Sequence, residues 1–470
     1  MKDFSKKEIE NIKTLTENKQ TLIWDSLNRK EKESVFMFSD AYKDFLSRCK
    51  TEREAVLYMI DKAKQYGFVD LDSEQSPHGK YYKVYRDKVV ALTIFGKESF
   101  DKGFRIIGSH IDSPRLDLKQ NPLYEEVDLA LMKTHYYGGI KKYHWLARPL
   151  SMHGSVVTKG GKRIDIVLGE KESEPVFTIS DLLPHLSKTQ TGKKLSEAFD
   201  GEKLNILVGS LPIGDDKVKE RFKLAVLKEL YDHYQITEGD FISAEIELVP
   251  AGSARDVGFD RSLIGAYGQD DRICAFTSFE ALLETKKPEH TAVGLFFDKE
   301  EIGSEGSTGA KSRFFEDFIS DVIEKQEGQS TERMLRKSLI QSQMLSADVN
   351  AALEPDYQEV HDKKNAARLG YGICVTKFTG TGGKSGSSDA SAEYMGVIRD
   401  LFDKNNIVWQ TGELGKVDQG GGGTIAKFLA SYGMEIVDCG PALLSMHSPF
   451  EIASKADIYM TFKAYAAFFK

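Results

Sequence analysis

The chain has 470 residues, and its 64 Lys and Arg against 72 Asp and Glu give a formal net charge of −8. Its 40% hydrophobic content is too high for a disordered protein, and its length suits about two or three domains. No apolar run reaches the about 20 residues of a membrane helix, and the charged first segment predicts no secretory signal. The negative charge argues against a nucleic-acid partner. Four cysteines without C-x-x-C spacing predict a cytoplasmic protein with neither a disulfide framework nor a thiolate zinc site.

The N-terminal third of the chain is predicted to pass from helices to strands. Apolar residues recur at helical spacing through the first 65 residues, and Gly67 suits the end of the last helix. Strand-like runs follow at 81–96 and 103–113. Residues 122–250 differ in texture, because turns, aromatic residues and alternating apolar positions there predict a β-rich segment. That segment also contains one predicted helix, at 216–234.

The remainder of the chain alternates between predicted strands and helices. Apolar strand-like runs occur at 291–298, 344–349, 373–378, 406–410 and 435–440, with helix-like segments between them. Such alternation is typical of an α/β fold with a mostly parallel central sheet flanked by helices. We therefore expect one discontinuous α/β domain formed by residues 1–113 and 253–470. It would be interrupted by a β-rich inserted domain at 114–252.

Five short clusters of acidic residues and histidines follow apolar strand-like runs. They are His110 with Asp112, Asp270 with Asp271, Glu300 with Glu301, Asp348, and His447. In open α/β sheets, ligands bind beyond the carboxyl ends of the strands, so these clusters are expected to meet. Each cluster alone has an ordinary alternative: a solvated loop, a helix cap for the aspartate pair, or an acidic surface turn for the glutamate pair.

Together the five clusters predict a metal site. Imidazole and carboxylate ligands without thiolates suit zinc, manganese or cobalt. The number of candidates exceeds the need of one ion, which favours two metals sharing a carboxylate and activating a water between them. One of Glu300 and Glu301 would then be a ligand and the other a general base, and Asp112 would orient His110. The residues alone leave open which glutamate and which aspartate has which role. They predict a hydrolase of amides, peptides or phosphoesters.

The ordered segments GSHIDSP, YGQDDR, FFDKEEIGSEG, LSADVNAA and LLSMHSPFE resemble the aspartyl aminopeptidase family of dinuclear zinc aminopeptidases, the eighteenth metallopeptidase family. The resemblance covers essentially the whole chain, including the position of the insert. It implies an α/β zinc-peptidase core with a β-rich dimerisation domain. It also implies that dimers assemble into a tetrahedral dodecamer that encloses a chamber and cleaves peptides.

The resemblance also implies a role for each candidate residue. One metal ion would be held by His110 and Asp348, the second by Glu301 and His447, and both by Asp270, with Glu300 as the catalytic base and Asp112 supporting His110. Within TISDLLPHLSKT, His185 would reach a neighbouring subunit's active site and stabilise the oxyanion. Near GGKSGSSDAS, Lys384 would recognise an N-terminal Asp or Glu. A broader neutral or basic specificity stays open, because this Gly- and Ser-rich context departs from the animal enzymes.

Other readings of the sequence are weaker. Gly421, Gly423 and Ala426 match part of a dinucleotide-binding fingerprint, but a polar loop precedes them where a strand is needed. A dinuclear phosphoesterase would share the metal ligands, yet Arg115 and Arg272 are the main candidate phosphate-binding residues in the clusters. A shell protein without activity would be expected to have lost ligands, and none is missing.

Overall fold

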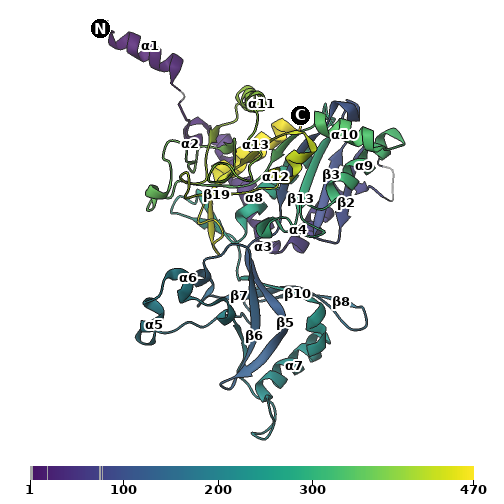
Figure 1. The fold of residues 1–470 in the computed structure, drawn as a ribbon, viewed down its shortest axis with the longest axis vertical. Coiled ribbons are helices and arrows are strands. Elements are labelled where there is room, and N and C mark those ends of the chain that lie inside the picture. The colour runs from purple at the N-terminus through teal and green to yellow at the C-terminus, as the bar shows by residue number, and fades with distance from the viewer. Residues whose placement is uncertain (1–3, 18, 73–75, 77) are drawn as a thin grey trace.

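The computed structural model describes residues 4–17, 19–72, 76 and 78–470. These residues form two lobes, an α/β core that carries both chain ends and a smaller β-rich insert (Figure 1). Within the described part of the chain, no helix combines the length and apolar character needed to cross a bilayer.

A mixed, mostly parallel sheet forms the centre of the core. In the described residues it has nine strands, and five of its eight neighbouring pairs are parallel. In spatial order the strands are β1 (Val69–Asp70), β2 (Lys80–Tyr85), β3 (Val89–Ile94), β13 (Ala292–Phe297), β4 (Arg105–His110), β14 (Gln343–Ser346), β20 (Glu435–Gly440), β16 (Ile373–Thr376) and β18 (Trp409–Thr411).

Helices cover both faces of this sheet. Adjacent side chains on a strand point to opposite faces, so Ile106 and Ile107 belong to two different apolar clusters. On the Ile107 side lie α2 (Ile23–Ser26), α3 (Arg29–Arg48), α4 (Glu52–Gln65), α8 (Gln269–Glu284), α11 (Ala392–Lys404) and α13 (Lys455–Phe468). On the Ile106 side lie α9 (Phe314–Glu327), α10 (Glu332–Gln341) and α12 (Ala426–Leu429). The central strands are therefore buried on both faces, as parallel sheets generally are.

The insert is built on an antiparallel sheet with its own apolar core. Among the described residues this sheet has six strands, in the order β8 (Arg163–Leu168), β7 (Leu150–Val157), β10 (Ala244–Pro250), β5 (Arg115–Glu126), β6 (Leu129–Tyr137) and β9 (Ile206–Gly209). Buried residues such as Leu116, Trp145 and Leu248 fill its core. The short helices α5 (Lys188–Thr191) and α6 (Leu195–Ala198) and the longer α7 (Arg221–Tyr234) also belong to this lobe (Figure 1).

Smaller sheets complete the core near the junction with the insert. One contains β11 (Arg255–Val257), β12 (Leu263–Ala266), β22 (Glu451–Ser454), β21 (Ala442–Leu444) and β15 (Asn350–Ala351), and another pairs β17 (Gly380–Thr381) with β19 (Gly421–Gly422). The first of these sheets brings the segment around His447 close to the start of α8, because β12 and β22 are paired. Helix α1 (Lys6–Thr16) projects from the core and has no buried residue (Figure 1).

The predicted α/β class, the mostly parallel sheet and the β-rich insert are confirmed. The helical N-terminal region consists of α1 to α4, and Gly67 follows the end of α4 with a φ of 82°, which glycine adopts without strain. The exact boundaries of the insert, at residues 114 and 252, and its role in dimerisation stay predictions.

Candidate metal centre

Three of the five predicted clusters meet because they follow neighbouring parallel strands. Strand β4 lies between β13 and β14 and is parallel to both. His110 is the last residue of β4, Glu300 follows β13, and Asp348 follows β14. The carboxyl ends of parallel strands lie at one edge of the sheet, which brings these side chains together.

Asp270 lies between the two histidines. Its Oδ1 is 3.2 Å from His110 Nε2, and its Oδ2 is 3.1 Å from His447 Nε2. His447 Nε2 is in turn 3.5 Å from Glu301 Oε2. Helix α8 begins after Gly268, which has no side chain to cap it, and the carboxylate of Asp270 faces the two histidines. This arrangement is what a carboxylate shared by two cations requires.

The donor atoms at this edge fit a metal ion. Two groups of three residues, found among the described residues, have ligand atoms within 4.8 Å of one another; they are His110, Asp270 and Glu301, and His110, Asp271 and Asp348. Glu301 Oε1 is buried and has no hydrogen-bond partner among the described residues. Imidazole and carboxylate donors suit zinc. The sequence alone left open whether Asp270 or Asp271 is the metal ligand. Asp271 also lies close enough to His110 and Asp348 to be one.

The electrostatics of the cluster favour cations. Burial raises the pKa of Asp348 and of Glu301 well above the usual range, and neighbouring carboxylates add to the effect. Burial opposes the charged form of His447, but the hydrogen bond to Asp270 and the charge of Glu301 raise its pKa to about 10. Buried carboxylates this close repel each other unless protons or metal ions separate them. The cluster therefore favours bound cations, either protons or metal ions.

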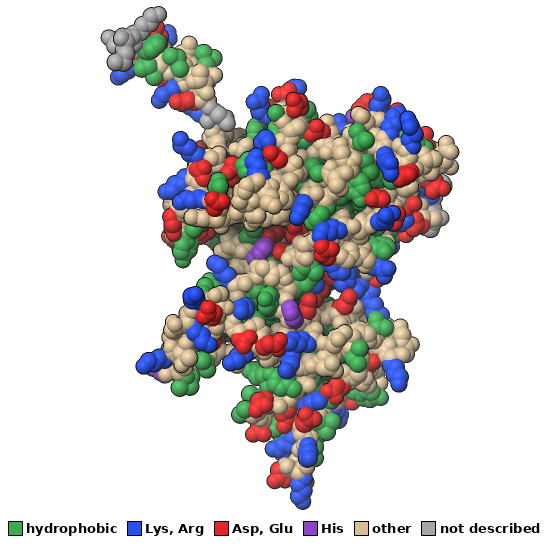
Figure 2. All heavy atoms as spheres, viewed as in Figure 1, with side chains coloured by type: hydrophobic (Ala, Val, Ile, Leu, Met, Phe, Trp, Pro, Cys, Tyr) green, Lys and Arg blue, Asp and Glu red, His purple; other side chains and the backbone are tan. Residues whose placement is uncertain are grey.

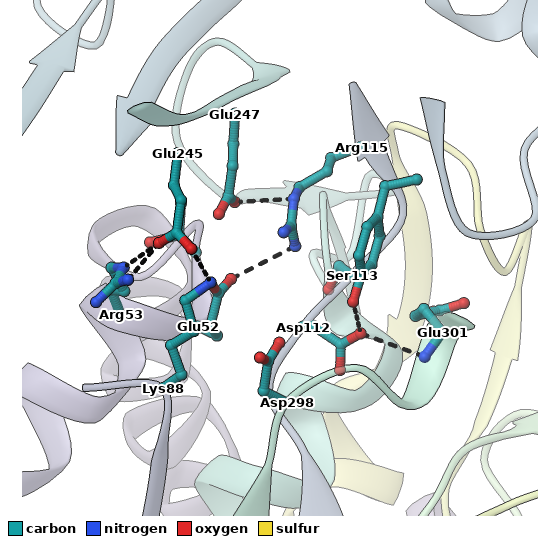
Figure 3. Close-up of polar contacts among 12 residues, drawn as sticks. Glu52, Arg53, Lys88, Asp112, Ser113, Arg115, Glu245, Glu247, Asp298 and Glu301 are labelled. Atoms are coloured by element: carbon teal, nitrogen blue, oxygen red, sulfur yellow. Dashed lines mark hydrogen bonds and ion pairs between the residues drawn. The ribbon is translucent and has the colours of Figure 1, made fainter. Parts of the chain in front are cut away.

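Asp112 holds several parts of the centre in place. Its Oδ1 lies 3.3 Å from His110 Nδ1 and accepts the backbone N–H of Glu300 at 3.1 Å. Its Oδ2 accepts the backbone N–H of Glu301 at 3.2 Å (Figure 3). Strand β4 ends at His110, so Asp112 reaches the imidazole from the following loop and not from the same strand face. The contact is the one expected when Asp112 orients His110.

Glu451 is a residue of the site that the sequence reasoning missed. It is buried, and its Oε2 accepts the backbone N–H of Gln269 at 2.6 Å and of Asp270 at 3.1 Å. Its Oε1 accepts the N–H of His447 at 2.8 Å. One carboxylate thus fixes the backbone of two candidate ligands. The available signal was an acidic residue four positions after His447, inside a segment already singled out.

The cluster opens into a cavity of about 570 Å³. Its lining includes Glu300, Glu301, Asp348 and His447 together with Phe378, Leu414, Phe428, Met446, Lys311, Lys427 and Gly421–Gly423. Histidine and acidic side chains are visible in the hollow between the two lobes (Figure 2). Of the two glycines in the weak dinucleotide fingerprint, Gly421 lies in β19, which pairs with β17, and both Gly421 and Gly423 line this cavity.

The two predicted substrate-binding residues, Lys384 and His185, are not among the described residues that line this cavity, although Lys384 contacts its wall at Phe378. Lys384 Nζ is 3.0 Å from Asp389 Oδ2 and 3.9 Å from the centre of the Phe378 ring. His185 is exposed in a short 3-10 helix, Pro184–Leu186, of the insert. The structure of one subunit therefore leaves their roles as predictions.

The fold and the donor set define a metal-dependent hydrolase with an α/β core. The comparison with known proteins gives the family: residues 45–469 match the family described as aminopeptidase I zinc metalloprotease (M18). The chain belongs to this family and is a metallo-aminopeptidase. A probable M18 family aminopeptidase 1 from Clostridium acetobutylicum is 51% identical, with 95% of this chain and 97% of that protein covered.

Solved structures of relatives agree with the fold. The crystal structure of an M18 aminopeptidase from Thermotoga maritima matches with a TM-score of 0.93 and 47% identity, covering 97% of this chain and all of that chain. Aminopeptidase I from Clostridium acetobutylicum matches with a TM-score of 0.90, also at 47% identity and with the same coverage. The predicted family and the inserted β-rich lobe are thereby confirmed.

Proposed function

We propose that this zinc aminopeptidase uses two divalent cations, the first held by His110, Asp270 and Asp348. Asp270, Glu301 and His447 would hold the second. The observation that carries this proposal is the position of the Asp270 carboxylate, with one oxygen facing each histidine at 3.2 and 3.1 Å. A carboxylate in that position can offer one oxygen to each of two cations.

Glu300 is the proposed catalytic base. When bound, the two cations would polarise the scissile carbonyl and lower the pKa of a water molecule between them. Burial, with added repulsion from Asp112 and Asp270 and against the opposing effect of His110, raises the pKa of Glu300 to about 7. Its carboxylate lies beside the proposed cation site, with Oε2 3.9 Å from His110 Nε2, and can accept a proton from the attacking water and return it to the leaving amino group.

The cavity next to the centre is the proposed site for the N-terminal side chain of the peptide. Phe378, Phe428 and Leu414 provide an apolar wall, which suits neutral side chains. Lys311 pairs with Glu305, whereas no carboxylate of the described residues forms an ion pair with Lys427. We propose that Lys427 binds an acidic N-terminal side chain more directly than the predicted Lys384, whose charge faces Asp389.

The assembly is proposed to be an oligomer built from dimers. Leu182, Leu183 and Leu186 surround His185 with side chains that are at least half exposed, which would suit contact with a second copy. A structure of mApe1 from S. cerevisiae, which is 21% identical to this chain, is described as a dodecamer. We propose the same assembly here, with His185 entering a neighbouring subunit's site.

The proposed location is the cytoplasm. Four unpaired, buried cysteines support this prediction.

The test is hydrolysis of a panel of aminoacyl anilides with free N-termini, with bis(p-nitrophenyl) phosphate as the phosphoesterase probe. Chelation should abolish cleavage of the anilides, and zinc, cobalt or manganese should restore it. Undiminished cleavage by metal-free protein would contradict the proposal, as would a faster reaction with the phosphodiester.

The same panel tests the cavity. Lys427→Met should lower kcat/KM for Asp and Glu anilides by about 10-fold or more and leave the Leu anilide little changed, because only the acidic side chains lose a charged partner. Lys384→Met is the matched control. If Lys384→Met has the larger selective effect, Lys427 is not the specificity residue.

A further inference from the structure

The end of one insert strand enters the metal centre of the core. Strand β6 ends at Tyr137, whose hydroxyl donates a hydrogen bond of 2.7 Å to Asp112 Oδ2. Two residues later, the carbonyl oxygen of Gly139 lies 2.9 Å from His447 Nδ1. A proton on Nδ1 satisfies that carbonyl and leaves Nε2 free to face the cation site. The insert thus contacts two parts of the centre through one short segment.

Asp112 is the point where this contact matters. Its carboxylate already accepts the N–H groups of Glu300 and Glu301 and lies against His110. The hydroxyl of Tyr137 supplies a further donor to Oδ2. Asp112 itself is fully buried. Removing the hydroxyl would leave the orientation of the carboxylate less constrained, and with it the backbone of the glutamate pair.

Tyr137 is itself held from behind by Arg115. The two residues are register partners on β5 and β6, and the guanidinium carbon lies 4.0 Å from the centre of the tyrosine ring. Arg115 is 6% exposed, and its Nε is 2.8 Å from Asp117 and 3.2 Å from Glu247.

A core helix also holds this arginine. Arg115 Nη1 lies 3.4 Å from Glu52, a buried residue of α4, as the network in Figure 3 shows. Arg115 is thus tied to carboxylates of both lobes, which fixes the plane on which the Tyr137 ring stacks.

We propose that Tyr137 is a positioning residue supplied by the insert, which orients Asp112 and thereby sets the geometry of the His110–Glu300–Glu301 centre. The insert is then part of the catalytic apparatus of its own subunit, in addition to any role in assembly. The measurement of kcat in its test rests on the proposed function, whereas the measurement of zinc affinity is independent of it.

The decisive variant is Tyr137→Phe in the full chain, because it keeps the stacked ring and removes only the hydroxyl. Loss of such a supporting contact typically lowers metal affinity or activity about 10–100-fold. We expect the affinity for zinc, measured by competition with a chromogenic chelator, to fall within that range. We also expect kcat for an aminoacyl anilide to fall and KM to change much less.

The matched control is Tyr136→Phe. Tyr136 precedes Tyr137 on β6, and its side chain is 42% exposed on the other face of the strand. It should bind zinc and turn over as the wild type does. Thermal unfolding of both variants checks that the folded fraction is the same.

The outcomes separate the two proposals. A Tyr137→Phe protein with wild-type zinc affinity and kcat overturns this inference and leaves the proposed function intact. A variant that loses only thermal stability also overturns it, because that result assigns Tyr137 a purely structural role. A wild-type protein that binds no divalent cation overturns both.

Discussion

Replacement of Glu451 tests how the centre is held together. Its carboxylate accepts three backbone N–H groups, from Gln269, Asp270 and His447, all in a buried region. Each buried donor left without a partner costs about 1–3 kcal/mol, so Glu451→Ala should cost about 3–9 kcal/mol. That range approaches the whole stability of many proteins, which is about 5–15 kcal/mol. We expect Glu451→Ala to be poorly folded or to melt far below the wild type.

Glu451→Gln is the graded version of the same change. One amide oxygen can replace Oε2 and continue to accept from Gln269 and Asp270, while the amide nitrogen then faces the N–H of His447. The expected cost is about 1–3 kcal/mol, concentrated at His447. The protein should fold, and its weaker zinc site should lose about 10–100-fold in affinity.

The assay is thermal unfolding with and without zinc, together with a zinc titration of each folded variant. Glu359→Gln is the control, since Glu359 is exposed in the 3-10 helix Gln358–Val360. Glu451→Ala with the stability of this control would refute the reasoning, because three buried donors would then have lost their acceptor at no cost. Equal effects of the Ala and Gln variants would refute the assignment of the loss to individual hydrogen bonds.

Three further changes test separate parts of the molecule. Glu300→Gln should retain both metal ions and lower kcat about 10²–10⁴-fold, and an unchanged kcat would reassign the base. His185→Ala should reduce kcat without changing metal content, whereas full activity would contradict a site shared between subunits. Burial raises the pKa of Asp457 to about 7, although the N–H groups of Gly370 and Gly372 oppose this shift. The pKa of Asp457 in the folded protein exceeds its unfolded value of about 4. Its contribution to the free energy of unfolding is therefore fully present below about pH 4 and is lost as the pH rises toward about 7. The loss is at most about 4 kcal/mol. The unfolding free energy of the wild type minus that of Asp457→Asn should therefore fall between pH 4 and 7; a flat difference contradicts this.

The fold was predictable because its signals are local and repeated. Continuous apolar strands such as 292–297 are buried on both faces, and a sequence shows this as an unbroken hydrophobic run. The alternation of such runs with helices then indicates a parallel sheet. The antiparallel pairing at β3 and β16 was not predictable in this way, because single apolar runs carry no information on strand direction.

The candidate site was only partly predictable. His110, Glu300 and Asp348 converge because parallel strands end together, which is a general rule. Asp270 and His447 arrive by another route, through the first turn of α8 and the small sheet in which β12 pairs with β22. The strand-end rule led us to expect that they join the other clusters, but no local pattern indicates this route between segments so far apart.

The supporting residues Glu451 and Tyr137 could not be predicted from the sequence for a related reason. Glu451 acts through backbone N–H groups of other segments, and Tyr137 acts through a carboxylate on another lobe. A glutamate or a tyrosine in these sequence segments does not indicate which distant group it will contact. Contacts of this kind depend on the packing of distant elements, and only the folded structure supplies it.

The position of the insert in the chain explains why it can influence the centre. Strand β5 begins at Arg115, shortly after His110 and Asp112, so one connection to the insert starts inside the metal site. The next strand, β6, returns directly to the same place, where Tyr137 contacts Asp112. A rigid displacement of the insert would therefore pull on Asp112 through both the chain and the hydrogen bond. If subunits assemble through the insert, contact between them would reach the metal centre by this short route, and metal affinity should then depend on the state of assembly.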